Sequence, residues 1–240
     1  NEYLGDIIDS VISRRGLMKV GVVAAGAAAV AGSGAAAFVN APKAAALDTK
    51  GSLPGLGWTP IAPARTDAVE VPAGFAQDIV IRWGDPILAG APEFDPYNQT
   101  AAKQAGQFGY NCDYLGFFAL DKQHEVMVVN HEYTDEVIMF PGYDAANPTR
   151  EQVEIAWAAH GLSVVVVKKN QGNGKLKPVV GHRLNRRYTA TTPFEVTGPV
   201  RGSDYLKTSA DATGYRVLGT LNNCAGGNTP WGTVLSGEEN

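Results

Sequence analysis

The chain has 240 residues, of which 45% are hydrophobic, and its 20 basic and 24 acidic side chains give a net charge of −4. This length and composition suit one substantial globular domain or a piece of a larger protein, and the mild acidity argues against a nucleic-acid partner, which would require a concentrated basic surface. The 28 glycines and 14 prolines favour a turn-rich fold of strands over a helical bundle. Cys112 and Cys224 are too few for a disulfide framework, and nothing in the sequence requires a bridge between them.

Residues 1–46 have the composition of an export signal. The pair Arg14-Arg15 precedes an apolar residue and a lysine, as in twin-arginine signals. The uncharged stretch 20–39 is long enough to span a bilayer, but its alanines and glycines gain little on insertion, so a retained membrane anchor is the weaker alternative. Small residues at 44–46 provide a candidate cleavage site. We therefore expect the twin-arginine machinery to export the folded protein to the periplasm or out of the cell, with no stable membrane anchor.

An extended arm and one strand are predicted next. Four prolines within residues 47–74 prevent a long helix there, which indicates a linker or arm. Residues 76–83 form a strand candidate that ends in a Gly-Asp-Pro turn. Residues 87–107 show no periodicity and are expected to form a long loop.

Three antiparallel strand pairs are predicted in the rest of the chain. They are 113–120 with 125–130 around a polar turn, 162–169 with 176–183, and 214–221 with 231–236. The run of four valines in the second pair is short and β-branched, which favours a buried strand over a helix.

One helix is predicted between residues 148 and 160. Asn147 can cap its N-terminus, Pro148 suits its first position, and Gly161 can end it. His160 is interpreted as a packed histidine that stabilises the helix terminus, and not as a metal ligand. One face of this helix is predicted to contain Val153, Ala156, Trp157 and His160.

Several hairpins, few helices and no strand–helix–strand alternation predict an all-β fold. A sandwich and a propeller both remain possible from the pattern, because no repeated motif marks the blades of a propeller.

Polar side chains gather at the ends of predicted strands in three places. Carboxylate and amide oxygens suit calcium, while a thiolate suits a transition metal such as iron or zinc. Turn chemistry, in which Asn and Asp bond nearby backbone, is the alternative; it is favoured for Asn111 and Asn130, while Asp113 and Glu132 stay open between the two. The clusters are Asn111-Cys112-Asp113, Asn130-His131-Glu132-Tyr133, and Asn222-Asn223-Cys224 with Glu238-Glu239.

Other kinds of chemistry have less support. The His131-Glu132 pair lacks the second histidine of the helical zinc-protease motif, and the chain has only 4 histidines. The sequence contains neither a phosphate-binding Gly-Lys-Ser/Thr loop nor a Gly-x-Ser-x-Gly nucleophile elbow. Cys224 alone would fit a small buried side chain, and the adjacent Glu238 and Glu239 would point to opposite faces of a strand. Any chemistry is therefore expected to be metal-centred, and no residue is assigned as a nucleophile.

The segment Asn222–Asn240 resembles the signature of the PhoX-type alkaline phosphatases. It reads Asn-Asn-Cys-Ala-Gly-Gly-Asn-Thr-Pro-Trp-Gly-Thr-Val-Leu-Ser-Gly-Glu-Glu-Asn, and the resemblance runs over nineteen consecutive positions. Further segments resemble the same family: residues 80–86, 108–111 with 113–115, 130–134, and Gly198-Pro199 with Gly202.

The resemblance implies a β-propeller and an exported enzyme that hydrolyses phosphomonoesters. Residues 75–240 would form the early part of the propeller domain, which would continue beyond this fragment, and the fragment alone is expected to be inactive. The alternatives are a calcium-binding propeller of the same superfamily without catalysis, and a related phosphodiesterase or phytase.

The resemblance also implies an iron–calcium cluster. Cys224 would bind iron through its thiolate, Glu239 would be a cluster ligand to calcium, and Asp113 is a candidate calcium ligand. Glu238 and Glu132 are further candidate metal ligands without an assigned ion. Cys112 departs from the polar residue expected there and receives no role. The remaining metal and phosphate ligands are expected beyond residue 240.

Overall fold

The computed structural model describes residues 58–239, and the chain divides into two compact units, residues 1–77 and 78–240. The predicted export signal lies outside the described residues. In the first unit, residues 58–77 contain neither helix nor strand, and the ring of Trp58 meets that of Phe75 edge-on with 6.1 Å between centroids. Between residues 58 and 239, none of the helices has the length and apolar character needed to cross a membrane.

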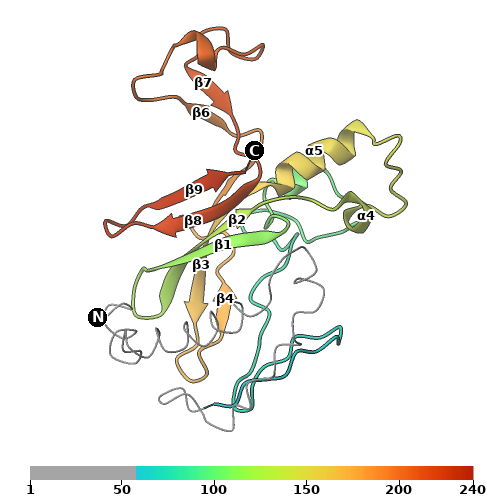
Figure 1. Ribbon diagram of the computed structural model, residues 1–240, viewed down its shortest axis with the longest axis vertical. Helices are drawn as coiled ribbons and strands as arrows, with labels where there is room; N and C mark the ends of the chain where they lie inside the picture. Colours follow the sequence, from blue (N-terminus) through green and yellow to red (C-terminus); the bar gives the residue numbers. More distant parts are fainter. Residues whose placement is uncertain (1–57, 240) are drawn as a thin grey trace, which may run out of the picture. The chain divides into compact units, whose positions relative to one another are not determined.

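The largest sheet of the second unit has five antiparallel strands (Figure 1). β1 pairs with β2, β2 with β3, and β3 with both β4 and β5. The first predicted hairpin and the valine strand are confirmed, and Val165, Val166 and Val167 are fully buried. The strands are β1 (Cys112–Ala119), β2 (His124–His131), β3 (Gly161–Lys169), β4 (Leu176–Pro178) and β5 (Arg186–Tyr188).

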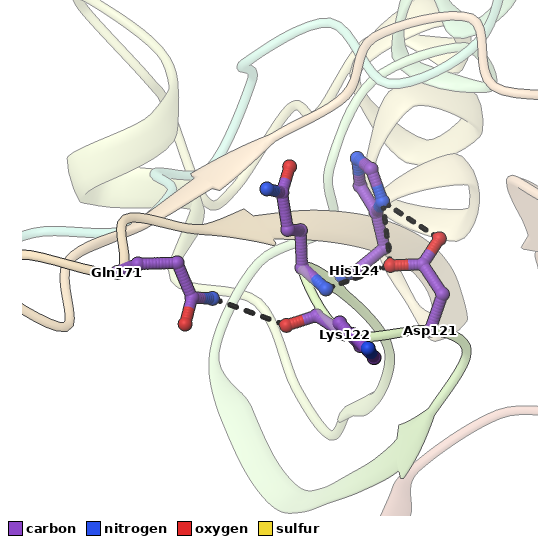
Figure 2. A network of polar contacts seen from close by, with 5 residues as sticks. Asp121, Lys122, His124 and Gln171 are labelled. Atoms are coloured by element: carbon purple, nitrogen blue, oxygen red, sulfur yellow. Dashed lines mark hydrogen bonds and ion pairs between the residues drawn. The ribbon is translucent and has the colours of Figure 1, made fainter.

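The turn between β1 and β2 is held by its own polar side chains. Asp121 accepts hydrogen bonds from the backbone N–H groups of Gln123 and His124 at 2.7 and 2.9 Å, and its carboxylate lies 2.9 Å from His124 Nδ1. Figure 2 shows Gln171, from the β3–β4 loop, donating to the carbonyl of Lys122 at 3.1 Å. The predicted polar turn is therefore confirmed, and it is joined to the neighbouring hairpin loop.

The predicted strand 176–183 is wrong beyond residue 178. The chain turns there because Asn185 takes the place of a strand partner: its Oδ1 accepts from Val166 N at 2.8 Å. Its Nδ2 donates to the carbonyls of Ile87 and Val179, each at 2.9 Å. This buried amide satisfies backbone groups between β4 and β5, where the ladder on β3 is interrupted.

The predicted helix is present as α5 (Arg150–Ala159), but its cap differs from the prediction. Thr149 is the N-cap and forms a capping box with Gln152, in which each side chain bonds the other's backbone N–H. Asn147 is engaged elsewhere, since its Nδ2 donates to Asp144 at 2.9 Å.

The predicted apolar face of this helix is also partly wrong. Ile155, Ala156, Ala158 and Ala159 are buried, whereas Trp157 is 45% exposed. His160 is buried, and its Nδ1 donates to the carbonyl of Ala156 at 2.7 Å, which confirms its interpretation as a packed residue at the helix end.

The third predicted strand pair, residues 214–221 with 231–236, is wrong. β7 (Arg216–Leu218) pairs instead with β6 (Pro193–Glu195), and β9 (Val234–Glu238) pairs with β8 (Asn223–Asn228). The sequence of β8 is rich in glycine and asparagine, and β6 begins at a proline. Both segments lack the alternating apolar pattern that predicts strands, so only their partners identify them.

The strand predicted at residues 76–83 is absent from the structure. Val80 and Ile81 are partly buried against the core without pairing to the sheet. The predicted loop 87–107 contains one short helix, α3 (Ala101–Gln104). Two other short helical segments are α4 (Glu136–Met139) and η1 (Asp204–Leu206). The core beneath β2 and β3 consists of Ile87, Phe108, Met127, Val129, Val165 and Val167.

Antiparallel sheet is thus the main regular structure of the described residues, with few helices, in agreement with the all-β prediction. The propeller stays a prediction.

Candidate metal centre

Two hairpins, β1–β2 and β8–β9, lie against each other (Figure 1). Their open ends are held by the same kind of backbone hydrogen bond. Each begins just after an asparagine in the left-handed region, Asn111 with φ 43° and Asn222 with φ 53°. Asparagine tolerates this conformation better than most residues. The carbonyl of Asn111 accepts from the backbone N–H of Glu132 at 3.1 Å, and that of Asn222 from Glu239 at 2.9 Å. Each asparagine therefore fixes the glutamate that follows the second strand.

Both hairpins also contain the same irregularity at their open ends. Between the pairs Cys112–His131 and Leu115–Val129, three steps along β1 oppose two along β2. The pairs Asn223–Glu238 and Gly226–Ser236 show the same offset in β8 and β9. An extra residue of this kind bends the strand and redirects the local side chains. The candidate ligands Asp113 and Cys224 lie in these two bulges, each two residues after its left-handed asparagine.

The asparagine-held ends and the bulges of the two hairpins bring together side chains that are far apart in the sequence. One carboxylate oxygen of Asp113, one of Glu132 and the Sγ of Cys224 all lie within 4.8 Å of one another. Metal–oxygen and metal–sulfur bonds are about 2.0–2.6 Å long, which places neighbouring ligand atoms roughly 3–4.5 Å apart. The three side chains therefore fit a bound cation with small adjustments, and their two donor types suit both a soft and a hard ion.

The charge around Glu132 has the same implication. Partial desolvation and the like charges of Asp113 and Glu239 raise the pKa of Glu132, and its carboxyl is within hydrogen-bonding reach of both. Glu239 thus lies near Glu132, although it is not one of the group of three. None of the five ion pairs among residues 58–239 involves these carboxylates. The cluster is a concentration of negative charge that a cation would stabilise.

Cys224 is held in place by a buried amide from the other hairpin. Asn130 is fully buried, and its Nδ2 donates to the carbonyls of Cys224 at 2.8 Å and Ala225 at 3.3 Å. Its Oδ1 accepts from Ser236 Oγ at 3.1 Å, and Ser236 in turn accepts from Asn223 Nδ2 at 2.9 Å. The interpretation of Asn130 as a turn residue is therefore wrong, because its partners lie 94 residues away or more.

A tyrosine closes the seam between the two hairpins. Tyr114 on β1 donates from its hydroxyl to Asn228 Oδ1, and Asn228 Nδ2 donates to the carbonyl of Phe117 at 3.2 Å. The tyrosine ring passes over Gly226, where a Cβ atom would meet ring Cγ at 2.5 Å. Glycine in β8 is therefore required by this close approach.

Two nearby residues lie outside the group of three. Glu238 Oε1 accepts from the backbone N–H of Leu221 at 2.7 Å, so this carboxylate is already engaged. Cys112 is paired with His131 across the sheet and forms no disulfide bond. Partial burial of its sulfur raises the pKa of the Cys112 thiol, which makes it a weaker source of thiolate.

Part of this arrangement has a signal in the sequence that the prediction from strand-end clusters did not use. Asn111 precedes Asp113 by two residues, and Asn222 precedes Cys224 by two. A repeated pattern of asparagine, any residue and ligand could have predicted two equivalent loop ends. The role of Asn130 has no such signal, because its partners are backbone carbonyls.

Replacing Glu132 by glutamine should change stability in opposite directions with and without metal. In the metal-free protein at neutral pH we expect a higher melting temperature, because one like charge is removed from the cluster. The raised pKa of Glu132 means that the difference disappears as the pH falls below the ordinary carboxyl range, where Glu132 is already neutral. With metal bound, the same variant should melt at a lower temperature, because a ligand is lost. Thermal melts with and without a chelator measure both signs, and an unchanged sign would contradict the metal site.

Known proteins resemble this chain in sequence and in structure. A family model described as alkaline phosphatase PhoX matches residues 56–240, which include every residue of the cluster. Among solved structures, Pseudomonas fluorescens PhoX in complex with vanadate, a transition state analogue, is similar with 39% sequence identity and a TM-score of 0.69. The match covers 75% of this chain and 31% of that chain, so the chain spans less than a third of its length. No curated protein matches the chain.

Proposed function

Because the chain belongs to the PhoX family of alkaline phosphatases, we propose that it forms part of an enzyme that hydrolyses phosphomonoesters at a metal centre. The observation that carries this proposal is the convergence of Asp113, Glu132 and Cys224 within 4.8 Å. The similar structure was solved with vanadate, a transition state analogue, and the same class of phosphoryl chemistry is proposed here.

The donor atoms support iron and calcium as the two kinds of ion. The thiolate of Cys224 would hold iron, because a soft sulfur ligand favours a transition metal. The carboxylates of Asp113 and Glu239 would hold calcium, which prefers several hard oxygen ligands. Glu132, between them, would bind either ion, and Glu238 stays the weakest candidate because its carboxylate is engaged with Leu221.

The charge of the side chains explains why such a site needs cations to act on phosphate esters. Asp113, Glu132 and Glu239 carry the same sign of charge as a phosphomonoester and would repel it. Bound metal ions supply positive charge that attracts the phosphoryl oxygens and stabilises the charge that develops on them during transfer. The protein's part is to hold the donor atoms in fixed positions, which the two asparagine-closed hairpins and Asn130 do.

The proposal includes the fold and the route of the whole protein. Residues 75–240 would form part of a β-propeller, in which ligands from different blades meet near the central channel. Residues 1–46 would be a twin-arginine signal and residues 47–74 an extended arm, so the enzyme would act in the periplasm or outside the cell. Export of an already folded protein would allow the metal centre to be assembled first.

The proposal is tested on the whole protein, purified with its metals. We expect elemental analysis to find iron and calcium, and we expect release of phosphate from p-nitrophenyl phosphate that a chelator abolishes. Vanadate should inhibit, because it mimics the transferring phosphoryl group and transition-state analogues bind more tightly than substrates.

Each other outcome has a defined meaning. Calcium without iron, and no hydrolysis, would indicate the calcium-binding propeller without catalysis. Faster hydrolysis of diesters or of phytate in a substrate panel would indicate the related phosphodiesterase or phytase. Phosphate release that is unaffected by metal removal would contradict a metal-centred reaction.

A further inference from the structure

The residue next to Glu132 is a histidine with no solvent exposure. The ring of His131 meets Phe108 edge-on, with 4.7 Å between centroids and an angle of 89°. On its other side lies Gly109, where an added Cβ atom would meet His131 Cδ2 at 2.5 Å. The ring therefore occupies a closely fitted site in which it has no room to turn.

The hydrogen bonds of His131 define which nitrogen carries the proton. Nδ1 lies 3.1 Å from the carbonyl of Tyr110, which can only accept, so Nδ1 is the donor. Nε2 then accepts from the hydroxyl of Ser163 at 2.7 Å. Burial, with the nearby charge of Arg187, lowers the pKa of His131 well below its ordinary value.

Ser163 is in turn oriented by a buried arginine. Arg187 donates from Nη1 to Ser163 Oγ at 3.2 Å and to the carbonyl of Leu162 at 2.9 Å. Its Nη2 donates to the carbonyls of Ala158 at 2.7 Å and His160 at 2.9 Å, where α5 ends. Burial lowers the pKa of Arg187 to about 9, so it remains a cation at neutral pH. The carbonyl end of a helix favours a cation, which explains how this charge is accommodated without a carboxylate partner among residues 58–239.

The far end of this chain of bonds reaches the backbone that presents the metal ligands. Tyr110, whose carbonyl accepts from His131, also donates its N–H to the carbonyl of Ala159 at 3.0 Å. Both polar groups of Tyr110 are thus fixed, one residue before the left-handed Asn111. The carbonyl of Asn111 then holds the N–H of Glu132.

We propose that His131 is a positioning residue of the metal centre, and that Arg187, Ser163 and His131 together hold the backbone on which Asp113 and Glu132 are presented. This inference rests on the proposed metal centre. Partners that orient metal ligands are often as important to affinity as the ligands themselves, and losing one typically weakens metal binding by about 10–100-fold. The bond from Nδ1 to Tyr110 is the one that reaches the ligand-bearing loop, so it should matter most for the affinity of the ions that Asp113 and Glu132 hold.

Two substitutions separate the two bonds of the ring. In His131→Asn the amide nitrogen takes a position like that of Nδ1 and can still donate to Tyr110, while the bond to Ser163 is lost. In His131→Gln the amide oxygen takes a position like that of Nε2 and can still accept from Ser163, while the bond to Tyr110 is lost. Both replace a ring by an amide, so both remove similar packing against Phe108.

The measurement is the calcium and iron dissociation constants of the intact protein by chelator competition, with the visible absorption of the iron site as a second readout. We expect His131→Gln to raise at least one of the two constants about tenfold or more, and His131→Asn to keep both within about threefold of wild type. Ser163→Ala leaves the ring in place and removes the same bond that His131→Asn loses, so it should give a measurable loss of up to about threefold, and it keeps the test open if both His131 variants fold poorly.

Asn185→Ala is the matched control, because it removes a buried amide with three backbone bonds that lies outside the metal cluster. It should lower the melting temperature of the metal-free protein without changing calcium or iron affinity. If His131→Asn, His131→Gln and Ser163→Ala alter the affinity for calcium and for iron no more than Asn185→Ala does, His131 has only a structural role and the inference fails while the metal centre stands. If the wild-type protein binds no iron, the proposed function fails and the inference falls with it.

Discussion

Replacing Cys224 by alanine is expected to remove both the bound iron and the hydrolysis of phosphomonoesters. Cys224 supplies the sulfur of the cluster, and its Sγ lies within 4.8 Å of the carboxylates of Asp113 and Glu132. Stabilisation of charge by a metal contributes several kcal/mol to such reactions, and each 1.4 kcal/mol is a factor of ten, so activity should fall by at least about a hundredfold. Iron per chain by elemental analysis and phosphate release from a model ester measure the two effects.

Cys112→Ala provides the matched control for this prediction. It removes the other thiol of the chain, which is one residue from Asp113 but outside the group of three. We expect this variant to keep its iron and its activity. Retention of both iron and activity by Cys224→Ala, or their loss in Cys112→Ala, would contradict the assignment of the sulfur ligand.

The second large effect is expected for Asn130→Asp, which changes a single nitrogen to oxygen. In the wild-type protein Asn130 Nδ2 donates to the carbonyls of Cys224 and Ala225. An aspartate in this fully buried position would place a carboxylate oxygen against two carbonyl oxygens, with no donor between them. An uncompensated buried charge costs about 3–5 kcal/mol, so we expect a loss of this size in the free energy of unfolding. Denaturant melts of the metal-free protein measure it.

Asn130→Asp should also weaken iron binding, because the backbone of Cys224 loses its anchor on the neighbouring hairpin. Ser236→Ala is the milder comparison: it removes the hydroxyl between Asn130 and Asn223 and leaves the bond to Cys224 intact. Loss of one such hydrogen bond costs about 1 kcal/mol. Equal effects of the two substitutions on stability and iron would show that Asn130 does not position the cysteine.

Stability and metal binding make opposing demands on the cluster. Desolvation, together with the like charges of Asp113 and Glu239, raises the pKa of Glu132 in the absence of a cation. The left-handed Asn111 and Asn222 add strain at the same place. The hydrogen-bond network around these residues, which includes the fully buried Asn130 and His131, compensates for the loss of stability. A site of this kind is stabilised when its ions bind.

Several local elements and the family resemblance follow from the order of the residues alone. Two apolar runs around a polar turn predicted the β1–β2 hairpin, and a short β-branched run of four valines predicted the buried strand, because such patterns depend only on residues that are close in the chain. The segment Asn222–Asn240 pointed to the PhoX family, which the match over residues 56–240 bears out. The five candidate metal ligands were also named from sequence.

Which of these residues meet depends on how distant segments of the chain pack together. Asp113, Glu132 and Cys224 come together because two hairpins with the same bulge lie against each other, and no local pattern encodes that contact. The partners of β6 and β8, and the backbone carbonyls held by Asn130, were missed for the same reason. Hydrogen bonds between segments about a hundred residues apart depend on the packing of the whole domain. Periodicity and capping patterns depend only on residues that are neighbours in the chain.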